Sequence, residues 1–306
     1  MRTGESLEDL VTIAAWMYYV ENQTQERIAA ELGLSRVKVS RLLAKAREQG
    51  VVQFRITRPL PEYYALRKEL QKRFGLKLVA VAKDRSSLGT LGADVLLHLI
   101  EERKPKRIGL GWSTTVSMMA THITGAAHLK KRECYVHDLA GSYVGLRNPY
   151  SISWLVAEVL EAHYVPLPVP VLVENPQVMK ESTIDKALKE ASEVDIAFVG
   201  MGCMGARSTL LKTGLVSKAI MDNLEARGAI GEVLMRFFDE NGRPIRTPLD
   251  ERIVSIGWEA IEKIPLFVVM AAGEEKIKPL RAALKGGWMS GLVTDKDTAK
   301  KLLEVE

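Results

Sequence analysis

The chain has 306 residues, of which 47% are hydrophobic, as is typical of a globular protein with a large core. Its length favours two domains, since one domain usually holds about 100–200 residues. The start, MRTGESLEDLV, has acidic residues where a signal peptide needs a basic and an apolar stretch. No apolar run reaches the roughly 18 residues of a membrane span. We therefore expect a cytoplasmic protein with no membrane partner.

Cysteines and histidines are too sparse to indicate a metal or redox site. The two cysteines, Cys134 and Cys203, cannot build a disulfide framework or a cysteine metal site. The five histidines lack the spacing of metal ligands. They are His98, His122, His128, His137 and His163. We expect no metal, no cofactor and no catalytic residue.

Positive charge is concentrated in one short segment. The whole chain has 43 basic and 38 acidic residues, a net charge of +5. Residues 36–58 contain seven basic side chains and a single acidic one, Glu48. The basic residues are Arg36, Lys38, Arg41, Lys45, Arg47, Arg55 and Arg58. A basic segment on a nearly neutral body predicts a polyanionic partner for that segment alone.

The residues before this segment predict two short helices. Apolar residues recur at helical spacing in the first helix, which we expect to continue to about Tyr19. They are Leu7, Leu10, Val11 and Ala14. Thr24 can cap a second helix over residues 25–32, in which Ile28 and Leu32 point inward. Gly33 then permits a sharp turn.

A third helix is predicted between the cap Ser35 and Gly50. Its buried face repeats at helical spacing and consists of Val39, Leu42, Leu43 and Ala46. The opposite face mixes long cations with small side chains, namely Val37, Ser40, Arg41 and Ala44, flanked by Lys38 and Lys45. Such a face suits a major groove, with Arg41 at a guanine edge, Val37 at a thymine methyl and the lysines at phosphates.

Residues 51–57, VVQFRIT, alternate in polarity and predict a strand with Val52, Phe54 and Ile56 inward. Together with the three helices, this strand predicts a winged helix-turn-helix DNA-binding domain over residues 1–58. The expected DNA-binding residues are Ser35, Arg36, Val37, Lys38, Ser40, Arg41, Lys45 and Arg47. The alternative is a three-helix core whose basic face is merely solvated.

The remainder of the chain has an α/β pattern. Residues 59–75 predict a break at PLPEYY and then a linker helix that ends at Gly75. From residue 76 to 306, short apolar strands alternate with amphipathic helices. The expected strands are KLVAVA, RIGLGW, DIAFVGMG, PLFVVMAAG and SGLVT. This alternation predicts a doubly wound, mostly parallel sheet that binds ligands at the carboxyl ends of its strands.

Three stretches of this domain could bind a ligand. RIGLGWSTTV predicts a strand, a turn at Gly109 to Gly111, and a helix whose free N–H groups and hydroxyls could hold a phosphate. The predicted phosphate residues are Ser113, Thr114 and Thr115, although an ordinary capped turn fits this pattern equally well. In AAGEEK, Lys276 lies in a first helical turn, where a cation is disfavoured unless an anion lies nearby. A surface lysine is the alternative.

The third stretch is ARGAIGEVLMRFFDENGRPI, in which we expect a hairpin around Asn241 and Gly242. Glu232 could accept hydrogen bonds from sugar hydroxyls, although a lone glutamate is more often structural or exposed. GMGCMG, residues 200–205, also matches a dinucleotide-binding pattern, with Asp222 about 20 residues on. We discount that reading, because the pattern lies deep in the domain and no apolar helical spacing follows Gly205.

The chain resembles the SorC-type sugar-binding transcriptional regulators along nearly its whole length. The motifs that carry the resemblance include QERIAAELGLSRVKVSRLLAKAREQG, LGWSTTV, LAGS, EVDIAFVGMG, GAIGEVLMRFFDENGRPI and VMAAGEEKIKPLRAALKGGWMSGLVTD. The resemblance implies a homo-oligomer, commonly a tetramer, that binds operator DNA and regulates genes of carbohydrate metabolism. It also implies an effector domain similar to sugar-phosphate isomerases and a phosphorylated sugar or polyol as effector. The implied effector-binding residues are Gly111, Ser113, Thr114, Thr115, Gly141, Glu232 and Lys276.

The rival function is a sugar-phosphate isomerase or deaminase with an appended DNA-binding domain. In glucosamine-phosphate deaminases, the segment that resembles DIAFVGMGCMGA carries a histidine after the third glycine, where this chain has Ala206. Loss of that proton-transfer residue favours binding without turnover. Some relatives hold their effector as a lysine Schiff base, but YVGLRNPYSIS, after LAGS, contains no lysine. We therefore expect a noncovalently bound effector.

Overall fold

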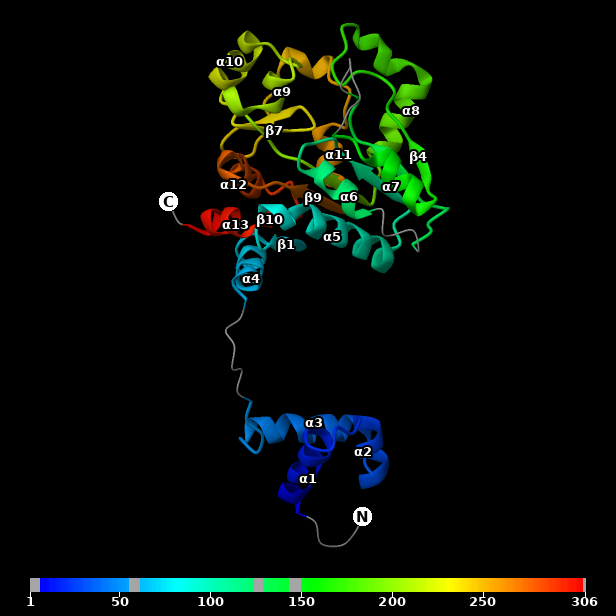
Figure 1. Cartoon of the computed structure of the whole chain (residues 1–306), viewed down its shortest axis with the longest axis vertical. Helices are drawn as coiled ribbons and strands as arrows, with labels where there is room; N and C mark the ends of the chain where they lie inside the picture. Colours follow the sequence, from blue (N-terminus) through cyan, green and yellow to red (C-terminus); the bar gives the residue numbers. More distant parts are fainter. Residues whose placement is uncertain (1–5, 55–60, 124–128, 143–149, 305–306) are drawn as a thin grey trace. The chain divides into compact units, whose positions relative to one another are not determined.

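The computed structural model describes residues 6–54, 61–123, 129–142 and 150–304. The chain divides into two compact units, residues 1–59 and 60–306 (Figure 1). Among the described residues, none of the helices has both the length and the apolar composition needed to span a bilayer.

The first unit contains the three predicted helices. They are α1 (Leu7–Tyr19), α2 (Gln25–Leu32) and α3 (Arg36–Glu48), and the side chains of Ser6, Thr24 and Ser35 cap them. Gly33 adopts the left-handed conformation, with φ at 65°, which permits the turn between α2 and α3. All four residues predicted for the inner face of α3 are buried, with Val11, Ala14 and Ile28 beside them.

The predicted strand after α3 is wrong for the residues that the structure describes. Residues 51–54 contain no strand, and Phe54, which we expected inward, is 66% exposed. Only Val52 packs against the core of this unit, whereas the Phe54 ring lies edge-on to Tyr19. Residues 55–57, including Ile56, lie outside the described residues. Leu7 is also exposed rather than inward, because it starts α1 and burial begins only at the following turn.

The second unit is built on a seven-stranded parallel sheet with strand order β1-β10-β9-β5-β2-β3-β4. Five strands match the predicted segments: β1 (Leu78–Ala82), β2 (Arg107–Leu110), β5 (Ile196–Val199), β9 (Leu266–Met270) and β10 (Gly291–Asp295). The sequence analysis missed β3 (Tyr135–Asp138) and β4 (His163–Val165). Both are short, and neither contains an apolar run.

Helices cover both faces of this sheet (Figure 1). One face packs against α5 (Leu88–Arg103), α6 (Ala120–Ile123) and α7 (Ser153–Leu160). The other packs against α4 (Glu62–Phe74), α8 (Ser182–Ala191), α11 (Trp258–Lys263), α12 (Ile277–Gly286) and α13 (Lys296–Leu303). The predicted doubly wound α/β architecture is therefore confirmed.

The helix that we predicted as a linker, α4, packs within the second unit. Leu66 and Leu70 are buried in the sheet core, and Lys300 forms an ion pair with Glu62 at 2.6 Å. Gly75 ends the helix in the left-handed conformation, as the sequence indicated. The amphipathic pattern of this segment therefore reflects packing on the sheet rather than a free connection.

A small antiparallel sheet stands beside the large one. It contains β6 (Gly202–Cys203), β7 (Gly231–Val233) and β8 (Arg236–Phe238), and α9 (Thr209–Lys212) and α10 (Lys218–Ala226) belong to the same region. The turn between β7 and β8 is formed by Leu234 and Met235, at φ 52° and 61°. Sequence analysis missed this turn, because neither residue type favours the left-handed conformation. The turn expected at Asn241 and Gly242 is present and returns the chain from Phe238 to Pro244.

His137 is an uncompensated polar group inside the large sheet. The side chain is 1% exposed on β3, and neither ring nitrogen has a hydrogen-bond partner within the described part of the chain. Burial lowers the pKa of His137 from 6.5 to about 4, opposed by the charge of Glu190 and assisted by that of Arg107. The ring is therefore neutral in the folded protein at pH 7.

Protonation of His137 should destabilise the fold in mild acid. In this range protons bind preferentially to the unfolded chain, whose histidine titrates near 6.5 rather than about 4, so stability falls as pH decreases. We expect a loss of about 2 kcal/mol from this group between pH 7 and pH 5. Urea denaturation of the wild type and of His137→Phe at both pH values measures it. His163→Gln, at an exposed histidine, is the control and should lose as much unfolding free energy as the wild type. An equally steep loss of unfolding free energy in His137→Phe would show that His137 is not the source of the pH dependence.

Candidate functional site

A cavity lies where the sheet topology reverses. From β2 the strand order proceeds through β3 to β4 at one edge, and from β5 it proceeds through β9 and β10 to β1 at the other. In open α/β sheets, ligands bind outside the carboxyl ends of the strands at such a point. The lining residues are Trp112, Ser113, Thr114, Thr115, Gly200, Met201, Gly202, Thr209, Leu210, Glu232, Leu234, Met235 and Lys276. The fold thus brings together five of the seven predicted effector residues, Ser113, Thr114, Thr115, Glu232 and Lys276.

The loop after β2 presents free backbone donors to this cavity. The Ser113 hydroxyl accepts a hydrogen bond from the N–H of Val116 at 2.8 Å, and the Ser113 N–H donates to the carbonyl of Tyr150 at 3.2 Å. These bonds fix the loop. Within the described residues, the N–H groups of Thr114 and Thr115 have no acceptor. Two unpaired donors next to two threonine hydroxyls are groups of the kind that bind an oxyanion.

The helix predicted after this loop is only partly α-helical and begins after Thr115. The chain forms a 3-10 turn over Val116–Met119 and then α6, which has only four residues. A helix this short contributes little macrodipole, so attraction for an anion would come from the local N–H groups and hydroxyls.

Glu232 faces the cavity because glycine stands opposite it. In the pairing of β6 with β7, Gly202 is the partner of Glu232, and a Cβ atom on Gly202 would lie 1.8 Å from Glu232 Oε1. Gly200 likewise leaves room for Ser113, since a Cβ atom on Gly200 would lie 2.4 Å from Ser113 Cβ. The first two glycines of GMGCMG therefore provide room for two polar side chains, which supports our rejection of a dinucleotide site.

The cavity combines a buried carboxyl group with a cation. Burial raises the pKa of Glu232, while a hydrogen bond from the Met235 N–H and the charge of Lys276 lower it. The Met235 bond is 2.8 Å long and uses Oε2. The Lys276 ammonium is partly buried and has no ion-pair partner in the part of the chain that the structure describes. An acceptor and an unpaired cation in one cavity suit a ligand that has both hydroxyl groups and a negative charge.

Gly111 and Gly141, the other two predicted effector residues, do not line the cavity. Gly111 is buried behind Leu234, whose Cδ2 would lie 2.7 Å from a Cβ atom on the glycine. Gly141 lies against the backbone of Val169, and its carbonyl accepts a hydrogen bond from Trp112 Nε1 at 2.9 Å. Both glycines allow close packing, and Gly141 orients Trp112 at the cavity wall.

Sequence analysis missed the apolar wall of the cavity, which consists of Trp112, Met201, Leu210, Leu234 and Met235. Trp112 and Met201 lie inside the two motifs that we singled out, so their position could have been inferred. Nothing in the local sequence distinguishes Leu210, Leu234 or Met235 from core residues.

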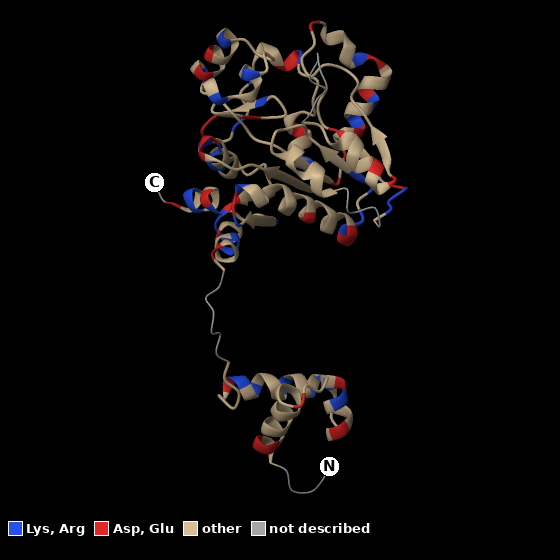
Figure 2. Ribbon diagram, viewed as in Figure 1, with Lys and Arg blue, Asp and Glu red and all other residues tan. Residues whose placement is uncertain are grey.

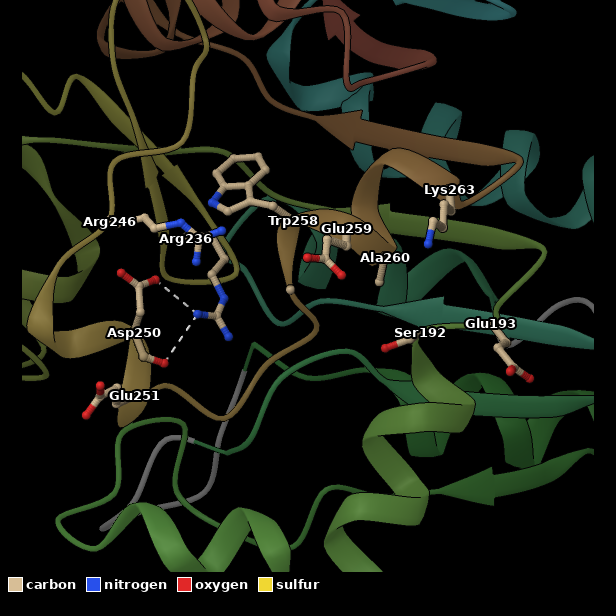
Figure 3. Close-up of a pocket in the computed structure, with 11 residues that line it drawn as sticks. Ser192, Glu193, Arg236, Arg246, Asp250, Glu251, Trp258, Glu259, Ala260 and Lys263 are labelled. Atoms are coloured by element: carbon tan, nitrogen blue, oxygen red, sulfur yellow. Dashed lines mark hydrogen bonds and ion pairs between the residues drawn. The ribbon is translucent and has the colours of Figure 1, made fainter.

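A larger cavity of about 680 Å³ lies beside Arg236 and Trp258 (Figure 3). The Arg236 guanidinium is nearly buried and forms an ion pair with Asp250 at 3.1 Å. Its other donors bond to Ser255 and to the carbonyls of Ile253 and Ile256. Each nitrogen of the guanidinium already has an acceptor, so Arg236 joins β8 to residues 250–256 and has no donor left for a ligand.

The outer face of α3 is basic and exposed, and Figure 2 shows lysine and arginine positions along this helix. Arg36, Val37, Lys38, Ser40, Arg41 and Arg47 are exposed, Val37 by 62%, and Lys45 is partly buried. Ser35 acts as a cap, since its hydroxyl accepts a hydrogen bond from the Lys38 N–H at 3.2 Å. Arg36 forms an ion pair with Glu26 at 2.9 Å. Arg41 and Lys38 have no ion-pair partner within the described residues.

Comparison with known proteins identifies the family. Residues 59–304 match the family model described as "Putative sugar-binding domain". Transcriptional regulator LsrR of an Enterobacter strain is 32% identical over 310 residues, covering 97% of this chain and 93% of its own length. The chain belongs to this family of sugar-binding transcriptional regulators.

Other relatives in the family also align with this chain over nearly its whole length. The sorbitol operon regulator of Klebsiella pneumoniae is 29% identical over 319 residues, covering 99% of this chain and all of its own. The crystal structure of full-length SorC from Klebsiella pneumoniae aligns with a TM-score of 0.74 at 28% identity, over 98% of this chain and 100% of that one. The agreement includes the helical first unit as well as the α/β unit.

The family assignment indicates a regulator rather than an enzyme. The similar proteins are named as transcriptional regulators. Ala206, at the position of the deaminase histidine, lies outside the Glu232 cavity.

Gly202 should be essential for the cavity. A methyl group in Gly202→Ala would overlap the Glu232 carboxyl group, so we expect a loss of about 1–3 kcal/mol in unfolding free energy. Urea denaturation measures the loss. Gly257→Ala is the matched control, because a Cβ atom there meets nothing within 4 Å. Equal stability of the two variants would show that Gly202 does not provide the room for Glu232.

Proposed function

We propose that this regulator binds operator DNA through α3 and binds a phosphorylated sugar or polyol in the Glu232 cavity. As a protein that acts on genomic DNA, it would work in the cytoplasm. The observation that carries the effector proposal is the convergence of the Thr114 and Thr115 N–H groups, Lys276 and Glu232 on one cavity. They come from three separate parts of the chain.

Each part of this cavity matches one part of such an effector. Free N–H groups, threonine hydroxyls and an ammonium group are the donors that proteins use for phosphate oxygens. A carboxylate is the acceptor that polyol hydroxyls require, and the indole of Trp112 offers an apolar surface to C–H groups. Two relatives are named for polyols, as a sorbitol operon regulator and as an erythritol catabolism regulatory protein. Their names support a carbohydrate effector for this chain.

A homo-oligomer, commonly a tetramer in this family, would connect the two activities. A single helix-turn-helix unit binds DNA weakly and gains affinity when a symmetric oligomer engages two half-sites. An effector held in the second unit can then alter DNA binding by changing how the subunits are arranged. Linkage requires that operator DNA changes effector affinity by the same factor.

Lys276 should distinguish a phosphorylated effector from a free sugar. A charged hydrogen bond contributes about 1.5–3 kcal/mol, so Lys276→Gln should weaken binding of a sugar phosphate by about 10- to 100-fold. Calorimetric titration with matched phosphorylated and free polyols measures this effect. The exposed Lys278→Gln, in the first turn of α12 just after Lys276, is the control. If the wild type binds both forms of the polyol equally well, the site does not recognise phosphate.

Arg41 and Lys45 should affect DNA binding in different ways. Arg41→Ala should cost about 1–3 kcal/mol on operator DNA and relax specificity at one base pair. Lys45→Ala should weaken binding to all sequences and reduce the salt dependence by about one unit. Fluorescence anisotropy with operator and random duplexes at several salt concentrations measures both. If Arg41→Ala loses the same affinity for operator DNA as for random DNA, Arg41 does not contact a base.

A further inference from the structure

The effector cavity is too small for the ligand that we propose. Its volume is about 40 Å³. Ligand sites for small molecules are usually about 300–1,000 Å³. A sugar phosphate can therefore enter only after part of the lining has moved. This requirement for movement rests on the proposed function of the cavity.

Most of the lining is held in place. Met201, Leu210 and Met235 are buried in the surrounding cores, and Trp112 is anchored by its hydrogen bond to the Gly141 carbonyl. Ser113 is fixed by bonds at both its hydroxyl and its N–H. Leu234 differs, since its apolar side chain packs against two hydrophobic clusters and is only partly buried between them.

Leu234 extends from the β7–β8 turn to the opposite wall of the cavity. Its Cδ2 atom occupies space next to Gly111, only 2.7 Å from the position of a Cβ atom on that residue. Gly111 is the first residue after β2 and leads into the proposed phosphate loop. The leucine side chain therefore lies beside the start of this loop and lines the same cavity as Glu232, in space that a polyol phosphate would need.

The turn that carries Leu234 is strained, and its backbone is tied to Glu232 by one hydrogen bond beside the buried Met235 side chain. Leu234 and Met235 both have left-handed backbone conformations, which residues other than glycine, asparagine and aspartate rarely adopt. The Met235 N–H donates to Glu232 Oε2 at 2.8 Å. This carboxyl group is also the proposed acceptor for effector hydroxyls. An effector would compete with the Met235 N–H for the bond that holds the turn.

We propose that Leu234 closes the effector site and sets its affinity. In the closed form, Glu232 holds the turn and Leu234 fills the cavity. Effector hydroxyls draw the carboxyl group away from the Met235 N–H, the strained turn relaxes, and Leu234 leaves the space beside Gly111. Affinity for the effector is therefore reduced by the fraction of molecules in which the site is closed.

Removing the leucine side chain tests this proposal. Calorimetric titration would use inorganic phosphate and sorbitol 6-phosphate as probes for the wild type, Leu234→Ala and Leu234→Gly. If about one molecule in ten is open, both variants should bind sorbitol 6-phosphate about tenfold more tightly. The gain for phosphate should be smaller, because phosphate needs less of the space that Leu234 fills. Leu234→Gly also removes the backbone strain and should unfold at a higher urea concentration than Leu234→Ala.

Leu215→Ala is the matched control, because Leu215 packs partly buried in the same hydrophobic cluster and does not line the cavity. It should leave the affinity for both probes unchanged. Binding of the probes by the wild type without a gain in either Leu234 variant would overturn the role of Leu234 alone. If no protein in the set binds either probe, the proposed phosphate site fails, and the role of Leu234 fails with it.

Discussion

Two glycines after β5 determine which side chains can line the cavity. Gly200 and Gly202 leave room for Ser113 and Glu232, and any larger residue would occupy the same space. The sheet topology places this segment beside the loop that follows β2, so the glycines act where two motifs meet. A pattern that is often associated with dinucleotides serves here to admit a serine and a glutamate.

The electrostatic arrangement follows from this crowding. A carboxyl group that leaves water is destabilised unless hydrogen bonds or a cation compensate it. Glu232 has both, in the Met235 N–H and the charge of Lys276, yet burial still raises its pKa. The Met235 N–H, Lys276 and Glu232 can interact with a ligand in place of one another, so binding needs no large movement of charged groups. The cavity is thus prepared for a polar, negatively charged molecule although it is closed in this form.

The two units use different physical means to recognise different partners. In the first unit a small apolar core holds α3, and its exposed cations are separated from one another by small residues. In the second unit, the proposed effector site consists of enclosed polar groups at the reversal point of a parallel sheet. Both resemble the corresponding parts of solved regulators, including full-length SorC. In the proposed mechanism, a symmetric oligomer would couple the two units, because such an assembly gains affinity for paired DNA half-sites.

The sequence by itself determined the features that depend on local periodicity and chain conformation. The three helices of the first unit, their caps and the turn at Gly33 follow from side-chain spacing and from the flexibility of glycine. The five longer strands and the doubly wound architecture follow from alternating apolar segments. Ser113, Glu232 and Lys276 could be named because each stands beside a recognisable strand, turn or helix start.

Tertiary structure alone decided the features that depend on distant contacts. The short strands β3 and β4 form because neighbouring strands pair with them, and α4 belongs to the sheet because Leu66 and Leu70 pack there. Local sequence places Gly141 in a ligand motif, but its close contact with Val169 excludes it from the cavity. Leu234 reads as an ordinary apolar residue, and only the fold brings its side chain against Gly111. Contacts between residues far apart in the chain leave no periodic signal, which is why the sequence could name the polar residues of the cavity but not its closure.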